Sequence, residues 1–347
     1  MNQAYFETLS KDYFGNLYQK VCSALTKGEN VCISVIPGFG EKTIFNFLNF
    51  NFKNDKLFNE IYIYDPELEN ESIIDYTKKL ESHKTSKTKL LIIRFFEQIE
   101  KKRETLEKLD NIRRKNPKSL TYLAVSNQEA FLNPSSHQAL TTVFFSELIY
   151  FSPFDFAHTE KMVESLASYY GWKIEPSSYK EIYNLSGGIP RIIKYLTKEL
   201  YESRIPLANK DKLTLIPQIG FQLRLMTRIL ITYDQKQIQL MGLIDEKYRL
   251  KSGLLKYFLK NFRSDMISNL YPQLGDTETK ILSFFSEKES KIVTLDNLAH
   301  LMKMSDDDFS LWAIYKLISR LKVKVKNNFN IKNLKGRGYI LSKSVNQ

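Results

Sequence analysis

The chain contains few residues of the kinds that cross-link small domains or bind metals. Its 347 residues include two cysteines, Cys22 and Cys32, and four histidines scattered along the sequence. So low a cysteine content excludes a disulfide framework and favours free, buried thiols in a reducing compartment. No cysteine or histidine cluster has metal-ligand spacing. We therefore expect neither disulfides nor a metal site.

Long apolar runs are also lacking. No apolar segment approaches the roughly 18 residues that a membrane-spanning helix needs. The first residues, MNQAYFETLSKDYF, lack the basic and apolar regions of a secretory signal. We expect a cytoplasmic protein that has no membrane partner.

Acidic residues are outnumbered, most clearly near the C-terminus. The chain has 51 Lys and Arg against 39 Asp and Glu, a formal net charge of +12. Residues 309–347 hold nine Lys or Arg and no acidic residue. A basic excess of this kind favours a polyanionic partner, and nucleic acid before membrane. We therefore expect double-stranded DNA as a partner.

The apolar pattern predicts several domains. Hydrophobic residues make up 43% and aromatic residues 13% of the chain, and 347 residues suffice for two or three cores. In residues 1–150, apolar runs at 31–36, 61–64, 90–96, 120–125 and 148–151 alternate with helical patterns. Buried strands separated by helices predict a parallel sheet covered on both faces. We assign 1–150 to this α/β domain and 151–205 to a helical lid, with a mixed, winged-helix-like segment at 206–265.

Residues 266–347 predict an α+β module, which a linker at 263–272 joins to the preceding segment. A first helix begins near Asp276, a short strand covers 292–294 and a second helix covers 295–302. A third helix carries an apolar stripe, and a hairpin turns at residues 335–338. A basic helix beside a basic hairpin is typical of a recognition helix in the major groove and a wing on the phosphates.

This module resembles the OmpR/PhoB-type winged helix-turn-helix domain. The likeness is carried by DTETKILSFF at 276–285, ISRLK at 318–322 and GRGYIL at 336–341. It implies DNA contacts from the third helix and the wing, although the usual receiver domain is missing. Among the cations, Arg320 carries a guanidinium that can make a bidentate guanine contact. The predicted DNA-binding residues are Trp312, Lys316, Ser319, Arg320, Lys322, Lys324, Lys335 and Arg337.

The first strand leads into a loop that partly matches a phosphate-binding loop. Such loops need glycines, a Lys for the phosphates and a Ser or Thr for Mg²⁺, in the pattern G-x-x-x-x-G-K-[ST]. The sequence at 36–43 is IPGFGEKT. With Lys42 and Thr43 aligned, Ile36 and Glu41 replace the glycines; with Gly38 and Gly40 aligned, Glu41 replaces the Lys. A carboxylate at this place repels phosphate.

The acidic residues expected after the third strand are also missing. An ATPase places Asp, often Asp-Glu, there to hold Mg²⁺ and polarise water. Here Arg94 and Phe95 occupy those positions, and Glu97 comes later. Two independent departures predict that the chain does not hydrolyse ATP, is not an enzyme and needs no cofactor. Binding of ATP or ADP without hydrolysis is left open.

The order of elements over residues 20–205 resembles the AAA+/STAND class of P-loop ATPases. Matching features are the Pro-Gly-Phe-Gly loop, Ser126-Asn127 after the fourth strand, YFSPFDFAHTEKMVESL after the fifth and LSGGIPRIIKYL in the lid. The resemblance implies that Arg191 approaches a nucleotide. The candidate nucleotide-binding residues are Gly38, Gly40, Lys42, Thr43 and Arg191. The predicted fold is thus a P-loop NTPase-like α/β domain with a helical lid, followed by α+β winged-helix structure.

Three functions fit these patterns. The first is a DNA-binding transcriptional regulator whose inactive ATPase-like domain serves assembly, including self-association, or senses a ligand. The second is an ATP-dependent switch, such as a replication initiator or a STAND-type defence protein. The third is a non-catalytic scaffold that binds other proteins at both ends.

Overall fold

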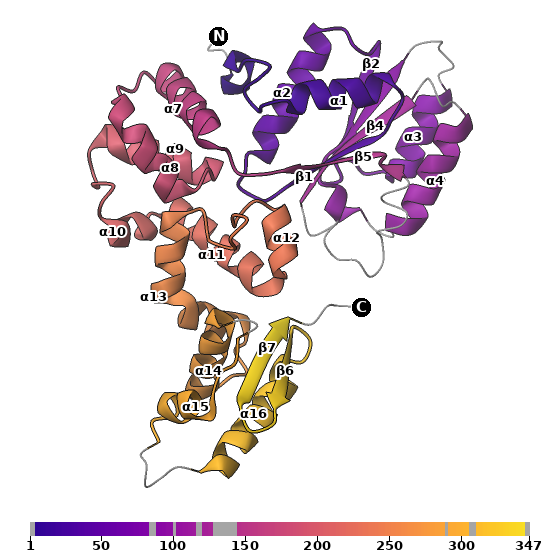
Figure 1. Cartoon of the computed structure of the whole chain (residues 1–347). Coiled ribbons are helices and arrows are strands. Elements are labelled where there is room, and N and C mark those ends of the chain that lie inside the picture. Colours follow the sequence, from indigo (N-terminus) through magenta and orange to yellow (C-terminus); the bar gives the residue numbers. More distant parts are fainter. Residues whose placement is uncertain are drawn as a thin grey trace. The chain divides into compact units, whose positions relative to one another are not determined.

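The computed structural model describes residues 4–82, 88–99, 102–115, 120–127, 144–288, 291–304 and 310–343. The chain divides into two compact units (Figure 1). The first comprises Met1–Asn209 and Gln239–Ser252, and the second comprises Lys210–Ile238 and Gly253–Gln347. Residues 206–265 are thus divided between the two units. The domain boundaries predicted from the sequence remain predictions.

The first unit contains a five-stranded parallel sheet. Its strands lie in the order β2-β3-β4-β1-β5, and every neighbouring pair is parallel. The strands are β1 (Val31–Val35), β2 (Glu60–Tyr64), β3 (Lys89–Ile93), β4 (Leu120–Asn127) and β5 (Glu147–Phe151). The predicted parallel sheet is confirmed. Because β1 lies between β4 and β5, the segment after β1 emerges at the carboxyl edge of the sheet between these two strands.

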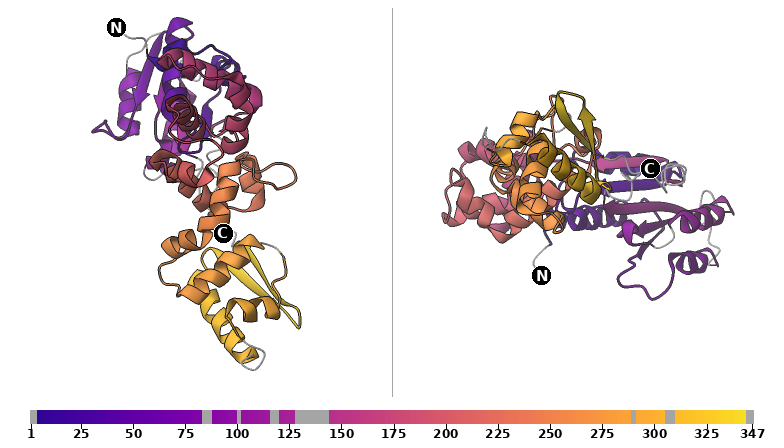
Figure 2. Two further views of the ribbon diagram at one scale, coloured as in Figure 1. Left: turned by 90° about the vertical axis from the view of Figure 1, so that its left-hand side faces the viewer. Right: turned by 90° about the horizontal axis from the view of Figure 1, so that it is seen from below.

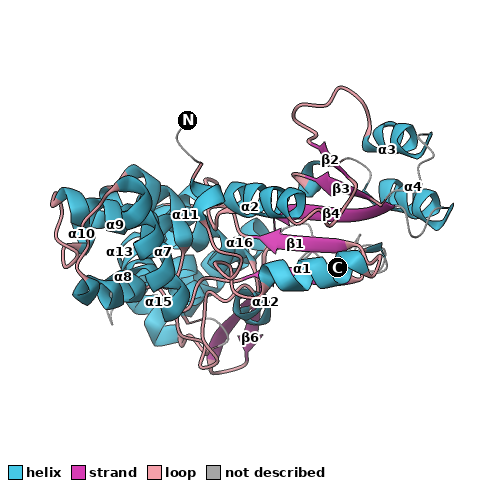
Figure 3. Ribbon diagram, turned by 90° about the horizontal axis from the view of Figure 1, so that it is seen from above, coloured by secondary structure: helices cyan, strands magenta, loops and turns pink. Residues whose placement is uncertain are grey.

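Helices cover both faces of this sheet (Figure 3). On one face, Leu91 and Tyr122 pack with apolar side chains of α3 (Ile73–Ser82) and α4 (Lys102–Lys115). Successive residues of a strand point to opposite faces, and Ile33 and Val125, which point to the other face, are also buried. Helix α1 (Leu17–Thr26) contacts β1 and β4. Continuous apolar runs were therefore the correct signal for these strands.

One strand is shorter than its apolar run predicts. The run extends to Phe96, but β3 ends at Ile93. Phe95 has a φ of 47°, outside the extended region, and a 3₁₀ turn, η2, follows at Phe96–Gln98. The residues of this turn remain apolar because Phe96 is buried in the same core as Leu91. An apolar run therefore continues beyond the end of the strand.

The helical lid follows β5. It consists of α7 (Phe156–Tyr170), η3 (Pro176–Ser178), α8 (Tyr179–Ser186) and α9 (Pro190–Glu202). The glycine pair between α8 and α9 fixes the lid against the segment after β5. The Phe154 amide donates a hydrogen bond to the Gly188 carbonyl at 2.9 Å. A Cβ on Gly188 would lie 1.9 Å from the Phe154 oxygen, so only glycine fits there.

The second unit is mainly helical. Its helices are α10 (Lys210–Leu215), α11 (Pro217–Thr232), α13 (Gly253–Leu270), α14 (Asp276–Glu287), α15 (Leu295–Leu301) and α16 (Leu311–Val325); α12 (Gln235–Leu240) spans the two units. The predicted linker at 263–272 is wrong, because α13 continues to Leu270. Met266 and Ile267 are buried, and Ile267 belongs to the core of this unit.

The C-terminal residues form three helices and a hairpin (Figure 2). The hairpin consists of β6 (Phe329–Leu334) and β7 (Gly338–Lys343). The predicted stripe of α16, which includes Ile314 and Leu321, is buried in a core shared with α14, α15 and both strands. Val293 pairs with Tyr339 through two backbone hydrogen bonds of 2.8 and 2.9 Å. This arrangement is compatible with a winged-helix domain.

Candidate nucleotide site and nucleic-acid interface

The loop after β1 places two predicted residues on the first turn of a helix. Helix α2 runs from Glu41 to Asn54, so Lys42 and Thr43 follow its first residue. Gly38 and Gly40 have φ angles of 90° and 93°, a backbone region that favours glycine. The N-terminus of α2 leaves amide groups unpaired within the helix, and such termini attract phosphates. The glycines therefore serve a turn that presents Lys42 and Thr43 at the carboxyl edge of the sheet.

The lid forms the opposite wall of this site. Pro190 opens α9, and the Arg191 amide donates a hydrogen bond to the Gly38 carbonyl at 3.3 Å. Lys194 lies one turn further along α9, which brings it to the same face as Arg191. Its ammonium nitrogen is 5.7 Å from the centre of the Tyr170 ring. The lid thus contributes two cations opposite the loop.

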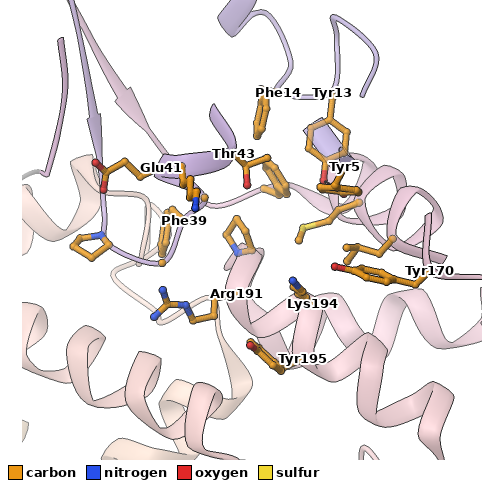
Figure 4. A pocket seen from close by; sticks show the side chains of 18 residues that line it. Tyr5, Tyr13, Phe14, Phe39, Glu41, Thr43, Tyr170, Arg191, Lys194 and Tyr195 are labelled. Carbon is orange, nitrogen blue, oxygen red and sulfur yellow. Dashed lines mark hydrogen bonds between the residues drawn. The ribbon is translucent and has the colours of Figure 1, made fainter. Parts of the chain in front are cut away.

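The loop and the lid enclose a pocket of about 450 Å³ (Figure 4). All five predicted nucleotide-binding residues line it, and their roles remain predictions. The remaining lining residues are Tyr5, Tyr13, Phe14, Pro37, Phe39, Glu41, Phe154, Met162, Leu166, Tyr170, Pro190, Lys194 and Tyr195. In Figure 4, Glu41 lies at one end of the pocket and Tyr170 at the other, and Arg191 and Lys194 lie across from Thr43. Lys42 and Arg191 therefore line the part of the pocket near the loop, and aromatic rings line the part near Tyr170, which Lys194 also reaches.

Glu41 is the residue of the loop that fits phosphate least. Glu41 is the first residue of α2, and it is half-buried. The pKa of Glu41 is raised to about 7, chiefly by burial and then by the negative charge of Glu97; Arg94 lowers it and Glu67 adds the smallest increase. Near neutral pH, Glu41 is therefore divided between a neutral and an ionised form.

Arg94 stands where an acidic residue was expected after the third strand. Its guanidinium donates a hydrogen bond to the buried carboxylate of Asp65 at 2.5 Å. It also lies over the rings of Phe45 and Phe95, at 4.8 and 4.7 Å from their centres. These contacts hold the loop after β3 against β2 and α2, so Arg94 has a structural role.

Glu97 brings a carboxylate back to the end of β4. Its Oε2 accepts hydrogen bonds from the Ser126 hydroxyl and the Asn127 amide, both at 3.0 Å. The turn at Phe95 and Phe96 carries Glu97 from the end of β3 to this position. Ser126 and Asn127, which the sequence placed after the fourth strand, are the last two residues of β4, and both donate hydrogen bonds to Glu97, the acidic residue that comes later than expected.

Sequence reasoning missed most of the aromatic end of the pocket. Tyr5 and Tyr13 come from the segment before α1, and their hydroxyl oxygens are 2.9 Å apart. Burial raises the pKa of both Tyr5 and Tyr13, so both stay neutral. No motif marks these residues. Lys194 could have been found, because it lies three positions after Arg191 on a predicted helix.

The predicted DNA-binding residues fall on α16 and on the hairpin turn. Ser310 caps the N-terminus of α16: its hydroxyl oxygen accepts a hydrogen bond from the backbone amide of Ala313 at 3.3 Å. Trp312 is 69% exposed, and the ammonium nitrogen of Lys316 lies 4.6 Å from the centre of its ring. Ser319 and Arg320 are exposed one turn further on. These four side chains share the face of α16 away from the core.

Two of the predicted cations contact other parts of the module. Lys324 forms an ion pair of 2.6 Å with Glu278 of α14. Glu278 is only 5% exposed, and although burial raises its pKa, Lys324 and the Gly275 amide lower it more, to a net decrease. The ammonium nitrogen of Lys322 lies 5.6 Å from the centre of the Tyr339 ring of β7. Their DNA contacts stay predictions, and Lys324 also holds α14 to α16.

The hairpin turn exposes the two remaining predicted residues. Lys335 and Arg337 are exposed, and the Arg337 amide donates a hydrogen bond to the Leu334 carbonyl at 2.8 Å. Gly338 has a φ of 125°, and a Cβ there would lie 2.1 Å from the Val293 oxygen. The glycine lets β7 approach Val293, which fixes the base of the wing.

The described part of the chain contains neither a membrane-spanning helix nor a cluster of metal-binding side chains. Across these residues, no helix is both long and apolar enough to span a membrane. Nor do three or more His, Cys, Asp or Glu side chains gather, in the ranges that the structure covers, where they could hold a metal ion.

Comparison with known proteins finds likeness in structure alone. No family model matches the chain, and no curated protein matches its sequence. Thermotoga maritima RuvB, a Holliday junction branch migration motor, matches with 16% identity and a TM-score of 0.45 over 98% of this chain and 96% of that chain. The Aeropyrum pernix ORC1 protein in complex with DNA matches with 9% identity and a TM-score of 0.40, over 94% and 87%. Caenorhabditis elegans PCH-2 matches with 14% identity and a TM-score of 0.38, over 62% and 70%.

These matches correct one prediction. This comparison contradicts the expectation that the chain is not an enzyme. The Thermotoga maritima protein in the comparison, 96% of whose chain is covered, is a motor. The replacements at Glu41, Arg94 and Phe95 therefore do not decide whether nucleotide is hydrolysed. The OmpR/PhoB likeness of the C-terminal module stays a prediction from its sequence.

Proposed function

We propose that the chain is an ATP-dependent switch that acts on duplex DNA. The observation that carries nucleotide binding is the pocket of about 450 Å³ in which Lys42 and Thr43 share a cavity with Arg191 and Lys194. Ligand pockets in proteins have volumes from about 300 to 1,000 Å³. A helix N-terminus, three cations and a hydroxyl around one cavity suit a polyphosphate.

The two ends of the pocket orient the nucleotide. The phosphates lie at the loop, between the start of α2 and the cations of α9. The base lies at the other end, among Tyr5, Tyr170, Met162 and Leu166. Aromatic and aliphatic side chains there exclude water from the base, and the neutral tyrosine hydroxyls offer it hydrogen bonds.

Glu97 is the side chain that we propose as the base for hydrolysis. It accepts a proton from water while the water oxygen bonds to the terminal phosphorus and the bond from that phosphorus to the bridging oxygen breaks. The hydrogen bonds from Ser126 and Asn127 hold its carboxylate in one orientation. The Thr43 hydroxyl, on the first turn of α2, fits the Mg²⁺ ion that accompanies the phosphates. Arg94 is committed to Asp65 and takes no part.

Isothermal titration of the full chain with ATP and Mg²⁺ tests the nucleotide site. We expect Lys42→Ala to weaken binding at least tenfold, because one charge-assisted contact to phosphate is lost. Lys20→Ala, on the exposed face of α1, is the matched control and should bind as the wild type does. Glu97→Gln should bind ATP but release no phosphate. Absence of wild-type binding at millimolar ATP would refute the proposal.

DNA binding rests on the charge of α16 and the hairpin. Phosphate contacts make affinity fall steeply with salt. In an anisotropy assay on random duplex DNA, we expect the triple variant Lys316→Ala, Arg320→Ala and Arg337→Ala to lose at least tenfold in affinity at moderate salt. Unchanged binding would exclude this interface. A salt slope near zero would instead favour a scaffold that binds proteins.

The effect of ATP on DNA affinity separates a switch from a simple regulator. A transcriptional regulator of the kind first predicted needs only the DNA interface, so its affinity would be the same with and without ATP. A switch couples the two sites, and we expect ATP to change DNA affinity at least threefold. Lys42→Ala should abolish this change without altering DNA binding in the absence of nucleotide.

A further inference from the structure

The outward face of α16 combines apolar and polar side chains in one row. Residues at spacings of four, three and four share a face of a helix, and here they are Trp312, Lys316, Ser319 and Val323, all of them exposed. We call this row the ridge. Its two ends are apolar, with Trp312 69% and Val323 67% exposed. Leu311 and Tyr315 of the same helix are also exposed large apolar residues.

The ridge is flanked by cations on both sides. On the side of α14, the exposed Arg320 supplies the charge and lowers the pKa of Glu278, whereas Lys324 is paired with that carboxylate. On the side of the hairpin, Lys322 lies over Tyr339. A helix in a major groove has bases in front of its outermost row and a phosphate backbone on either side. The flanking charges match the two backbones, and the ridge therefore meets the bases.

We propose that the ridge selects thymine-containing sites through the 5-methyl groups of thymine. This inference rests on the proposed DNA function and specifies its sequence preference. In the major groove, thymine presents a methyl group, and apolar side chains are its partners. Trp312 and Val323 supply these contacts at the two ends, and Lys316 and Ser319 contact the base edges between them.

The length of the ridge sets the spacing of the thymines. Val323 lies eleven positions after Trp312, which at a rise of about 1.5 Å per residue is about 16 Å along the helix. A base-pair step is about 3.4 Å. The two thymines are therefore about five steps apart, a footprint that one recognition helix can cover.

Duplexes that differ only in the methyl group test this inference. Binding of the full chain to alternating A–T duplex is compared with binding to the same duplex carrying uracil in place of thymine. A buried methyl group contributes about fourfold in affinity, so two contribute about 15-fold. We expect this ratio in favour of thymine, and a similar gain when 5-methylcytosine replaces cytosine in G–C duplex.

Variants assign the preference to the ridge. Val323→Ala should reduce the thymine-to-uracil ratio to about fourfold, and Trp312→Ala in addition should reduce it to about one. Leu215→Ala removes an equally exposed aliphatic side chain from α10 and should leave the ratio unchanged. Lys335→Ala should weaken binding to both duplexes equally, because it contacts phosphate. Binding with a wild-type ratio of one would overturn this inference and leave DNA binding standing. Absence of binding to every duplex would overturn the DNA function itself.

Discussion

Replacement of Glu41 by glutamine should remove a pH dependence from nucleotide binding. Glu41 begins α2 beside the loop, and burial raises its pKa to about 7. A phosphate placed at the start of α2 meets a neutral group below this pH and a carboxylate above it. If nucleotide binds only the neutral form, apparent affinity falls by the factor 1 + 10^(pH − pKa), which is about 1.1 at pH 6 and about 11 at pH 8. Wild-type affinity should thus fall about tenfold across this range.

The variant supplies the comparison that isolates Glu41. The charge of ATP itself changes with pH, so the measured quantity is the ratio of Glu41→Gln affinity to wild-type affinity at each pH. We expect a ratio near one at pH 6 and about ten at pH 8, measured by competition with a fluorescent ADP analogue. Glu67→Gln is the control, because Glu67 affects the pKa of Glu41 least and does not line the pocket. A ratio that stays constant from pH 6 to 8 would refute the reasoning.

The same shift predicts how stability changes with pH. The pKa of Glu41 is about 7 in the folded chain and near 4.5 in an unfolded one. A group with a raised pKa favours the folded state most below its unfolded pKa, and this stabilisation is lost as pH rises through the folded pKa. Glu41→Gln should therefore be more stable than wild type at pH 8, by about 1 to 2 kcal/mol after allowance for solvent screening. Chemical denaturation at pH 5 and 8 measures this; equal differences at both pH values would contradict it.

Two further substitutions test structural roles. Lys324→Met should lower the stability of the second unit by about 2 kcal/mol, because it leaves the buried Glu278 carboxylate without its ion-pair partner. Adding Glu278→Gln should restore part of the lost stability. An unchanged melting temperature would exclude a contribution of the ion pair to stability. Gly188→Ala should disrupt the lid and weaken ATP binding, since its Cβ would lie 1.9 Å from the Phe154 oxygen. Gly171→Ala, at a φ of 70° with nothing within 4 Å, should cost only about 1 to 2 kcal/mol of backbone strain in chemical denaturation, and equal effects on ATP affinity would contradict the close approach.

The sheet was predictable because its strands are buried on both faces. Continuous apolar runs such as the one at β1 have few other uses in an α/β domain. Where an apolar run ends was not predictable, since Phe96 is as apolar as the strand but lies in a turn. The reverse error occurred in α13, where a polar stretch suggested a linker although Met266 and Ile267 continue the buried face. Both errors arise because burial depends on tertiary contacts that local composition does not record.

The pocket shows a similar division. Loop residues such as Lys42 carry a recognisable spacing, and Arg191 lies in a segment whose glycines and proline mark a turn into a helix. Tyr5 and Tyr13 reach the same cavity from the segment before α1, and no spacing rule connects them with the loop. Their place depends on how that segment packs against α2 and α7, which is decided by the whole unit.

Charge patterns in the sequence cannot separate cations that bind a partner from cations that hold the fold. Residues 309–347 contain no acidic residue, and on that basis Lys316 and Lys324 were both predicted to bind DNA. The acidic partner of Lys324 is Glu278, which lies on another helix, 46 positions earlier in the chain. Lys316, which belongs to the exposed ridge, lies instead over the exposed ring of Trp312. The two lysines therefore separate by assay. The pair of Lys324 with the buried Glu278 contributes to stability and is screened by salt only weakly, whereas a contact of Lys316 with DNA contributes to affinity and weakens as salt rises.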